Sequence, residues 1–239
     1  MSKIIALWAS PRNISTALMY SFSQRLDLKV IDEPFYAYYL THVNPNVNHP
    51  GKKEILASQN SNFKTVLEEI EILKQKYGCV FIKNMTHHLS GEDLSFTKNW
   101  YNIILTRDPQ KAIISFSKVI SKPTMEDLGY KLQYDLANYF ISKNINFKRT
   151  LSENLLKNPF KVLIDLCDFS KIKFHSKMLS WKKGGIAEDG IWAKYWYKNV
   201  HNSNSFSPWE SKPNEVINSN HSMLLEQATH YYHQLISLS

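Results

Sequence analysis

The chain has 239 residues, of which 43% are hydrophobic, and it carries a formal net charge of +8 at pH 7. This size and composition predict one compact domain, residues 1–239, with a sizeable core. The sequence contains neither a run of 18 apolar residues nor a long apolar segment behind a charged start, so we expect a cytoplasmic protein that does not associate with membranes.

The positive charge restricts the classes of partner. A basic chain suits nucleic acid, a membrane surface or a small polyanion. The lysines are scattered, and no helix-turn-helix, zinc-finger or ribonucleoprotein pattern occurs, which favours a small polyanion over nucleic acid. Cys79 and Cys167 lie in apolar segments and are expected to be buried thiols, so nothing in the sequence suggests a disulfide or a metal site.

The first predicted strand, Ile4–Trp8, leads through a tight turn into a predicted helix at Ser15–Arg25. The turn carries the cation of Arg12, and the helix starts with the hydroxyls of Ser15 and Thr16. Backbone N–H groups at a helix N-terminus bind anions, and hydroxyls add donors. The segment is therefore a candidate phosphate cradle, although it has no glycine and lacks the Gly-x-x-x-x-Gly-Lys pattern. An ordinary capped helix after a buried strand is the alternative.

The second predicted strand, Lys29–Asp32, ends at Glu33, and the aromatic run Phe35–Leu40 behind it is expected to begin a helix. Its tyrosines either line a pocket for an apolar or aromatic ligand or pack in the core. The elements expected next are a loop, a helix and a third strand, at Asn44–Lys53, Phe63–Lys76 and Cys79–Lys83.

The fourth predicted strand, Asn102–Thr106, runs into a predicted helix at Pro109–Ile120, where proline suits the first turn. Arg107 lies at the strand end, and Ser115 lies about two turns along the helix. An arginine and a serine eight residues apart can hold one phosphate from two sides. Taken alone, the pair is better explained as a surface arginine and a helix serine, and its position relative to the first cradle strengthens the phosphate interpretation.

The rest of the chain continues the alternation of strands and helices. The elements expected there are a helix, a strand, a helix, a loop that is a candidate lid, and a helix, at Met125–Ser142, Ile145–Arg149, Pro159–Cys167, Asn199–Asn214 and His221–Leu235. This order predicts an α/β fold with a central parallel sheet flanked by helices. Ligands bind beyond the carboxyl ends of such strands, so polar residues at several strand ends should converge on one crevice.

These segments resemble the sulfotransferase family, whose donor is 3′-phosphoadenosine 5′-phosphosulfate (PAPS). The family's 5′-phosphosulfate loop reads Pro-[Lys/Arg]-Ser-Gly-Thr-Thr, and residues 11–16 align with it, the departure that matters being Ile14 at the position of the glycine. Its 3′-phosphate motif is an arginine and a serine eight residues apart, like Arg107 and Ser115. Lys183 and Gly184 look similar to the family's Lys-Gly loop. The resemblance spans residues 4 to about 195 and indicates a divergent bacterial-type member.

The resemblance implies an enzyme that binds PAPS as co-substrate in a P-loop-like phosphosulfate-binding loop and needs no metal. The residues implied for that binding are Pro11, Asn13, Ile14, Ser15, Thr16, Arg107, Ser115, Lys183 and Gly184. It also implies that Arg12 stabilises the charge that grows on the leaving phosphate.

The base that deprotonates the acceptor has more than one candidate. Glu33 is preferred, because branches of the family with arginine in the loop often use a glutamate at the end of the second strand. His87 is the rival, in a segment that resembles the family's Lys-Thr-His segment with two inserted residues, and His88 takes the role if the register slips. A carboxylate needs only modest desolvation to act as a base near neutral pH.

The acceptor is not fixed by the sequence, and a small molecule or a glycan carrying a hydroxyl or an amine fits equally. The oligomeric state is not fixed either. Two other functions compete with sulfuryl transfer. One is a P-loop kinase for a small molecule, which would want a Gly-Lys-[Ser/Thr] loop. The other is a non-catalytic binder of nucleotide or nucleic acid that uses the basic surface.

Overall fold

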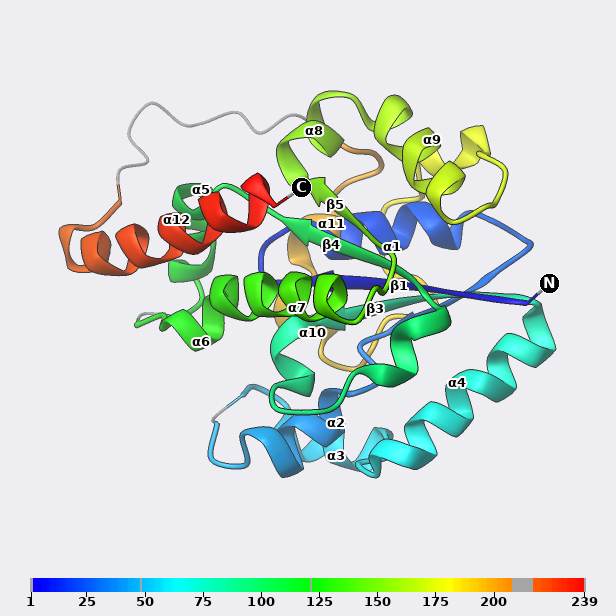
Figure 1. Ribbon diagram of the computed structural model, residues 1–239, viewed down its shortest axis with the longest axis horizontal. Coiled ribbons are helices and arrows are strands. Elements are labelled where there is room, and N and C mark those ends of the chain that lie inside the picture. Colours follow the sequence, from blue (N-terminus) through cyan, green and yellow to red (C-terminus); the bar gives the residue numbers. More distant parts are fainter. Residues whose placement is uncertain (1, 48, 121, 208–216, 239) are drawn as a thin grey trace.

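Five parallel strands form one sheet at the centre of the computed structural model, which describes residues 2–47, 49–120, 122–207 and 217–238 (Figure 1). The strands lie in the order β2-β3-β1-β4-β5. Their bounds are Lys3–Ala9 for β1, Lys29–Asp32 for β2, Cys79–Met85 for β3, Tyr101–Thr106 for β4 and Phe147–Leu151 for β5. The predicted α/β fold, a single domain with a central parallel sheet, is confirmed.

The register of the strands brings the candidate site residues to one edge of the sheet. Ala9, the last residue of β1, pairs with Met85 at the end of β3 and with Leu105 near the end of β4. On β2, Asp32 pairs with Lys83 of β3. The loops that follow β1, β2, β3 and β4 therefore all start at the carboxyl edge, where ligands bind in open parallel sheets.

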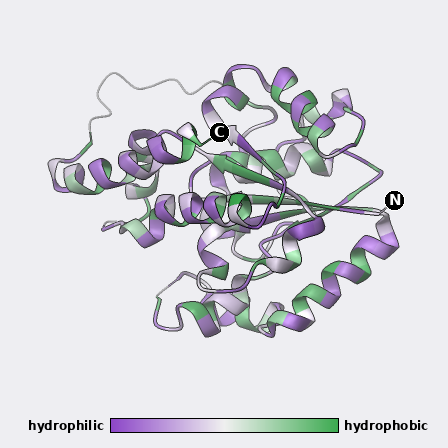
Figure 2. Cartoon of the chain, in the orientation of Figure 1, coloured by the Kyte–Doolittle hydropathy of each residue, from purple (hydrophilic) through white to green (hydrophobic). Residues whose placement is uncertain are grey.

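Helices cover both faces of the sheet (Figure 1). Side chains alternate along a strand, so β1 turns one set of apolar residues toward α1 (Ser15–Ser23) and α9 (Pro159–Phe169). It turns the other set toward α4 (Phe63–Tyr77) and α7 (Tyr130–Ser142). Figure 2 shows hydrophobic residues along the central strands, as expected for a parallel sheet that is buried on both faces.

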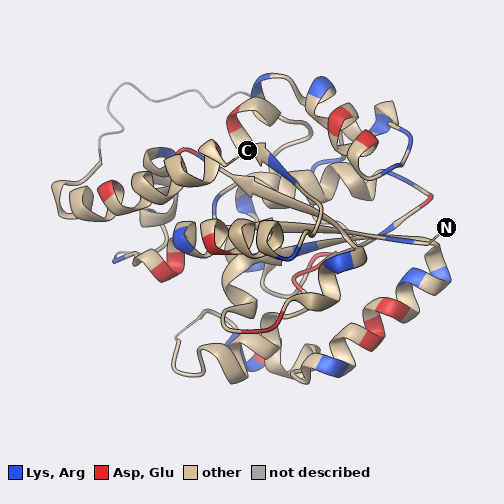
Figure 3. Cartoon of the chain, in the orientation of Figure 1, with Lys and Arg blue, Asp and Glu red and all other residues tan. Residues whose placement is uncertain are grey.

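The remaining elements are short, apart from the last helix. They are α2 (Tyr36–Tyr38), η1 (Tyr39–Val43), α3 (Lys52–Ser58), η2 (Thr86–Leu89), η3 (Ser95–Asn99), α5 (Pro109–Ser117), α6 (Met125–Leu128), α8 (Ser152–Lys157), η4 (Ser176–Leu179), α10 (Ala193–Trp196), α11 (Lys198–His201), η5 (Ser219–His221) and α12 (Ser222–Ser237). Charged residues are spread over the helices, as Figure 3 shows, in agreement with the scattered lysines of the sequence. Within the described ranges, every helix is too short or too polar to cross a membrane.

Three sequence predictions of local structure need correction. The single helix expected over Met125–Ser142 is two helices, because Gly129 has a left-handed backbone (φ 69°) that ends α6. The loop expected over Asn44–Lys53 was predicted two residues too long, since α3 begins at Lys52. The loop expected over Asn199–Asn214 begins inside α11, and its residues 208–214 lie outside the described residues.

Candidate active site

A cavity of about 520 Å³ lies at the carboxyl edge of the sheet. Its walls come from the loops behind β1, β2, β3 and β4 and from the segment around α10 and α11. The candidate site residues that line it are Pro11, Arg12, Ile14, Ser15, Thr16, Glu33, His87, His88, Arg107 and Ser115. The strand ends therefore converge as the fold requires.

The loop behind β1 turns into α1 with two left-handed residues and without a glycine. Arg12 (φ 65°) and Ile14 (φ 58°) both have left-handed backbones. This conformation is a strained one for a β-branched residue and costs roughly 1–2 kcal/mol. The loop is held from below, because Asn13 Nδ2 donates to the Leu105 carbonyl at 3.0 Å and Ser152 Oγ donates to the Asn13 carbonyl at 2.8 Å. Ile14 is the N-cap residue of α1, and the helix begins at the wall of the cavity.

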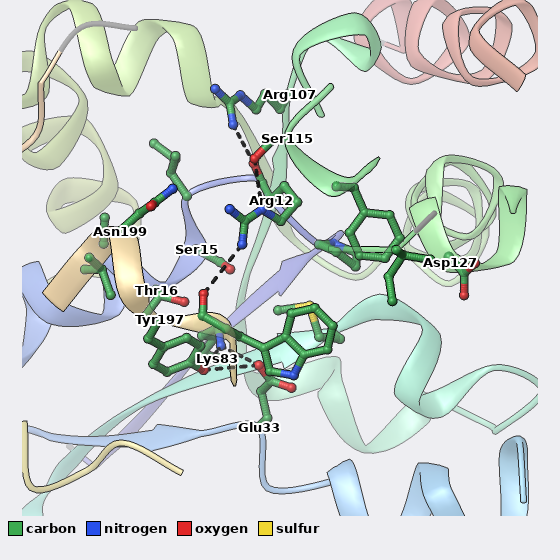
Figure 4. Close-up of a pocket in the computed structure, with 18 of the residues that line it drawn as sticks. Arg12, Ser15, Thr16, Glu33, Lys83, Arg107, Ser115, Asp127, Tyr197 and Asn199 are labelled. Carbon is green, nitrogen blue, oxygen red and sulfur yellow. Dashed lines mark hydrogen bonds and ion pairs between the residues drawn. The ribbon is translucent and has the colours of Figure 1, made fainter. Parts of the chain in front are cut away.

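Arg12 and the Arg107–Ser115 pair lie together at one end of the cavity (Figure 4). Arg12 Nε donates to Ser115 Oγ at 2.9 Å, and an Arg107 guanidinium nitrogen donates to the Arg12 carbonyl at 2.7 Å. Burial lowers the pKa of both guanidiniums, and Arg107 lowers that of Arg12 further. The buried cation of Arg107, the partly buried cation of Arg12, nearby hydroxyls and the N-terminus of α1 make a site that an anion with several charges would stabilise.

A second cluster of polar side chains, centred on Lys83, lies at the other end of the cavity (Figure 4). The Lys83 side chain is fully buried, and its Nζ lies 3.0 Å from Asp32 Oδ1 and 2.5 Å from Glu33 Oε1. The Tyr197 hydroxyl accepts from Lys83 at 2.5 Å and donates to Asp32 Oδ2 at 2.8 Å. Lys83, Asp32 and Tyr197 were not among the site residues predicted from the sequence. A lysine that directly continues an apolar strand run is the signal that would have pointed to Lys83.

Glu33 is placed for contact with a bound molecule. Its left-handed backbone (φ 42°) ends β2, and its buried carboxylate lines the cavity. Burial raises the pKa of this carboxyl, and the neighbouring Asp32 raises it further, against the opposing effect of Lys83. Oε1 is occupied by Lys83 and Tyr197, whereas Oε2 lies 3.8 Å from His88 Nε2. Oε2 is thus the oxygen with fewer partners.

The histidines beside Glu33 are embedded in aromatic rings. Tyr36 stacks on His88 with ring centroids 4.7 Å apart, and its hydroxyl lies 2.7 Å from His49 Nδ1. Burial lowers the pKa of His87 to about 3, and it lowers the pKa values of His88 and His49 as well. These rings are therefore neutral at pH 7, and this part of the cavity is polarisable and aromatic but carries little net charge.

Three predicted donor-binding residues do not line this cavity. Asn13 points beneath the loop, as described above. Lys183 is exposed, and Gly184 (φ 105°) donates its backbone N–H to the His201 carbonyl at 2.8 Å. The role of Lys183 and Gly184 in binding the donor stays a prediction. Within the residues that the structure describes, no group of three or more His, Cys, Asp and Glu side chains is placed to hold a metal ion.

The family described as "Sulfotransferase domain" matches residues 2–238 of the chain. The chain therefore belongs to the sulfotransferase family, and the family predicted from its motifs is confirmed. Solved structures agree with this in fold. The sulfotransferase domain of the Synechococcus PCC 7002 olefin synthase is 16% identical with a TM-score of 0.55, covering 96% of this chain and 95% of that one. A sulfotransferase from Alicyclobacillus acidocaldarius is 11% identical with a TM-score of 0.59, covering 100% and 98%.

Two longer plant proteins are similar in sequence. The branched-chain-amino-acid aminotransferase-like proteins 1 and 2 of Arabidopsis thaliana are 34% and 32% identical to 98% of this chain. The chain spans 42% and 41% of their lengths. Their names describe the whole proteins, so they assign no substrate to this chain.

Proposed function

We propose that the protein transfers a sulfuryl group from PAPS to a hydroxyl or an amine of a small-molecule acceptor. One observation carries the proposal. The loop of residues 9–16, the Arg107–Ser115 pair and the Glu33 carboxylate open into the same cavity, although they follow three different strands. PAPS, when bound, supplies an activated sulfuryl group on a phosphate leaving group.

The cationic end of the cavity fits a donor with phosphates at two positions. Arg12, Ser15 and Thr16 surround the N-terminus of α1, where an anionic 5′-group gains backbone and hydroxyl donors. Arg107 and Ser115 offer a second set of donors for a 3′-phosphate. The contact between Arg12 and Ser115 shows that the two sets adjoin, as one nucleotide with both groups requires.

Glu33 suits the role of base better than His87 does. Its raised pKa brings the carboxylate closer to the acceptor's proton affinity, whereas a histidine with a pKa of about 3 is a weak base. Glu33 would take the proton from the acceptor hydroxyl, the acceptor oxygen would form the new bond to sulfur, and the bond from sulfur to the 5′-phosphate oxygen would break. Arg12 would stabilise the charge that then develops on that phosphate.

The test is the nucleotide preference of the protein. Calorimetry should show that adenosine 3′,5′-bisphosphate binds roughly ten- to a hundredfold more tightly than adenosine 5′-phosphate, because a charge-assisted contact contributes about 1.5–3 kcal/mol. Incubation with PAPS should also release the bisphosphate, slowly to water and faster with an acceptor. Equal affinity for both nucleotides would overturn the 3′-phosphate assignment, and tighter binding of ATP with Mg²⁺ would favour a kinase.

A further inference from the structure

A second cavity, of about 740 Å³, adjoins the candidate active site. It lies among η1, η2, the α6–α7 region and α12, and His87 lines both cavities. Nothing in the proposed donor chemistry uses this space. Its position beside the end of the first cavity that holds Glu33 and the neutral histidines relates it to the acceptor rather than to the nucleotide.

The partition between the two cavities has two parts. One part of it is His87, whose ring meets Tyr39 at 4.9 Å and His88 at 4.7 Å between centroids. The other part is the four-residue helix α6, where Met125 and Glu126 line the second cavity and Asp127 lines the first (Figure 4 shows Asp127). His87 is 9% exposed, and its Nδ1 makes no hydrogen bond to any described residue. A buried polar atom without a partner at this position is suited to meet a bound molecule.

The lining of the second cavity defines a class of ligand. Most of its lining surface is apolar, although polar side chains also contribute, and the apolar and aromatic contributors include Tyr39, Met125, Leu132, Met223 and Tyr231. Of the charged residues in the lining, Lys131 is paired with Asp135 at 2.6 Å, whereas Glu126 and Glu226 have no cationic partner within the described residues. These surroundings favour the binding of a ligand with an apolar surface and disfavour a ligand with a negative charge.

The volume of the first cavity limits the size of an acceptor that fits there entirely. A single drug-sized ligand occupies a pocket of roughly 300–1,000 Å³, and the first cavity, at about 520 Å³, must hold the whole nucleotide. Only the reacting end of an acceptor then finds room beside Glu33. A larger acceptor must extend out of the first cavity. Beside His87, which lines both cavities, it can extend into the second cavity.

We propose that the second cavity binds the apolar body of an elongated acceptor without negative charge, whose hydroxyl reaches Glu33 past His87. This rests on the proposed sulfuryl transfer at the first cavity. His87 Nδ1 supplies a hydrogen-bonding atom at the passage, and the two unpaired carboxylates discriminate against anionic acceptors such as sulfated glycans.

The test uses two probes that share a reacting hydroxyl and differ in their apolar body, phenol and 4-hexylphenol. Their affinities are measured by calorimetry with the protein saturated with adenosine 3′,5′-bisphosphate. The hexyl compound should bind at least about tenfold more tightly, because each buried methylene adds roughly 0.8 kcal/mol. Leu132→Trp, which fills the second cavity, and Met223→Asp, which places a charge on its rim, should each remove most of that gain.

The controls separate this inference from the proposed function. Ile72→Asp changes an exposed apolar residue of α4 that lines neither cavity and should keep the full gain. Met223 is 73% exposed, so the Asp variant tests the inference even if Leu132→Trp fails to fold. Affinity for the bisphosphate in the same samples reports on the first cavity alone. If the bisphosphate binds while the two phenols bind equally, or hexylphenol not at all, or both variants keep the gain, the second cavity has no part in acceptor binding.

Discussion

The two ends of the candidate active site differ in the groups that surround their cations. At the end proposed to bind the donor (the donor end), Arg12 and Arg107 lie beside each other, and the described contacts of Arg12 are to a hydroxyl and to the Trp196 carbonyl rather than to a carboxylate. At the end proposed to bind the acceptor (the acceptor end), the cation of Lys83 is enclosed by Asp32, Glu33 and a tyrosine hydroxyl. The first arrangement attracts a polyanion, and the second is neutralised from within.

This difference follows from the order of the strands. The donor end is built on the adjacent strands β1 and β4, and the acceptor end on the adjacent strands β2 and β3. Because Lys83 is compensated by carboxylates, it should not compete with the arginines for the phosphates of the proposed donor. The neutral histidines around Glu33 likewise add no positive charge. The separation leaves one strongly cationic pole in the cavity, and such a pole fixes the direction in which an anionic donor lies.

Removal of the Lys83 cation, which neutralises the acceptor end, should have the largest effect. Lys83→Met leaves Asp32 and Glu33 as buried carboxylates without a cation, and the free energy of unfolding should fall by about 3–5 kcal/mol. Loss of the cation should also raise the pKa of Glu33 further, so turnover, which needs the carboxylate ionised, should begin at a higher pH than in the unmutated protein. Urea unfolding and the pH profile of PAPS turnover measure the two effects.

The matched control is a pair at the surface of the same sheet. Lys29 Nζ lies 2.6 Å from Glu188 Oε1, and both side chains are partly exposed. Lys29→Met should cost no more than about 1 kcal/mol, because water screens such a pair. Comparable losses in the two variants would mean that burial does not distinguish the Lys83 group, and the comparison between the two ends would fail.

Removing charge from the donor end tests the other half of the comparison. Arg12→Ala should lower turnover on the order of 10²–10³-fold, because the guanidinium stabilises charge that appears only as the leaving group departs. Donor affinity should fall much less. Release of adenosine 3′,5′-bisphosphate from PAPS measures turnover without a known acceptor. Arg12→Lys is the control that keeps the charge, and it should recover part of the rate. Equal losses of affinity and turnover in Arg12→Ala would place Arg12 in donor binding only.

The sequence predicts most of the fold because buried parallel strands are apolar runs and covering helices are periodic ones. The strand at Lys29–Asp32 matches β2, and the helix at Phe63–Lys76 differs from α4 by one residue. The break at Gly129 could not be anticipated, because the apolar period from Leu128 to Leu136 continues through the glycine. Helix α8 was not predicted, because it follows β5 without a turn signal.

The site was less predictable than the fold, and unequally at its two ends. The donor end follows from residues near one another in sequence, since each cradle belongs to one strand-to-helix connection. The acceptor end depends on a contact between Lys83 and Tyr197, which lie 114 positions apart. The sequence showed Lys83 only as the last residue of a strand. Whether a lysine there faces water or two buried carboxylates is decided by tertiary packing, which a single sequence does not reveal.

Arg107→Ala tests whether the donor end binds the 3′-phosphate separately from the 5′-phosphate. The variant should lose about 1.5–3 kcal/mol of affinity for adenosine 3′,5′-bisphosphate, while its affinity for adenosine 5′-phosphate should change little. The preference between the nucleotides should therefore disappear in calorimetric titrations. Lys111→Ala, which removes a positive charge from the same connection outside the cavity, should keep it. Equal weakening of both nucleotides by Arg107→Ala would show a general electrostatic effect.

The smallest expected effect concerns the neutrality of the acceptor end. Because His87 has a pKa of about 3 when folded and an ordinary value of 6.5, the unfolded chain binds more protons than the folded one below pH 6.5. Stability associated with His87 is thus fully present above pH 6.5 and is lost as the pH falls from 6.5 toward 3. The loss approaches about 1.4 kcal/mol for each pH unit in that window. His88 and His49, whose pKa values are also lowered, act in the same direction.

His87→Gln isolates this contribution, because glutamine is polar and does not titrate. Melting temperatures measured from pH 7 to pH 4.5 should fall less steeply in this variant than in the unmutated protein, even if its stability at pH 7 is lower. His42→Gln is the control, since His42 is exposed and its removal should leave the slope unchanged. An unchanged slope in His87→Gln would mean that His87 becomes protonated in the folded protein. The acceptor end would then carry a positive charge in mild acid, and the contrast with the donor end would be confined to neutral pH.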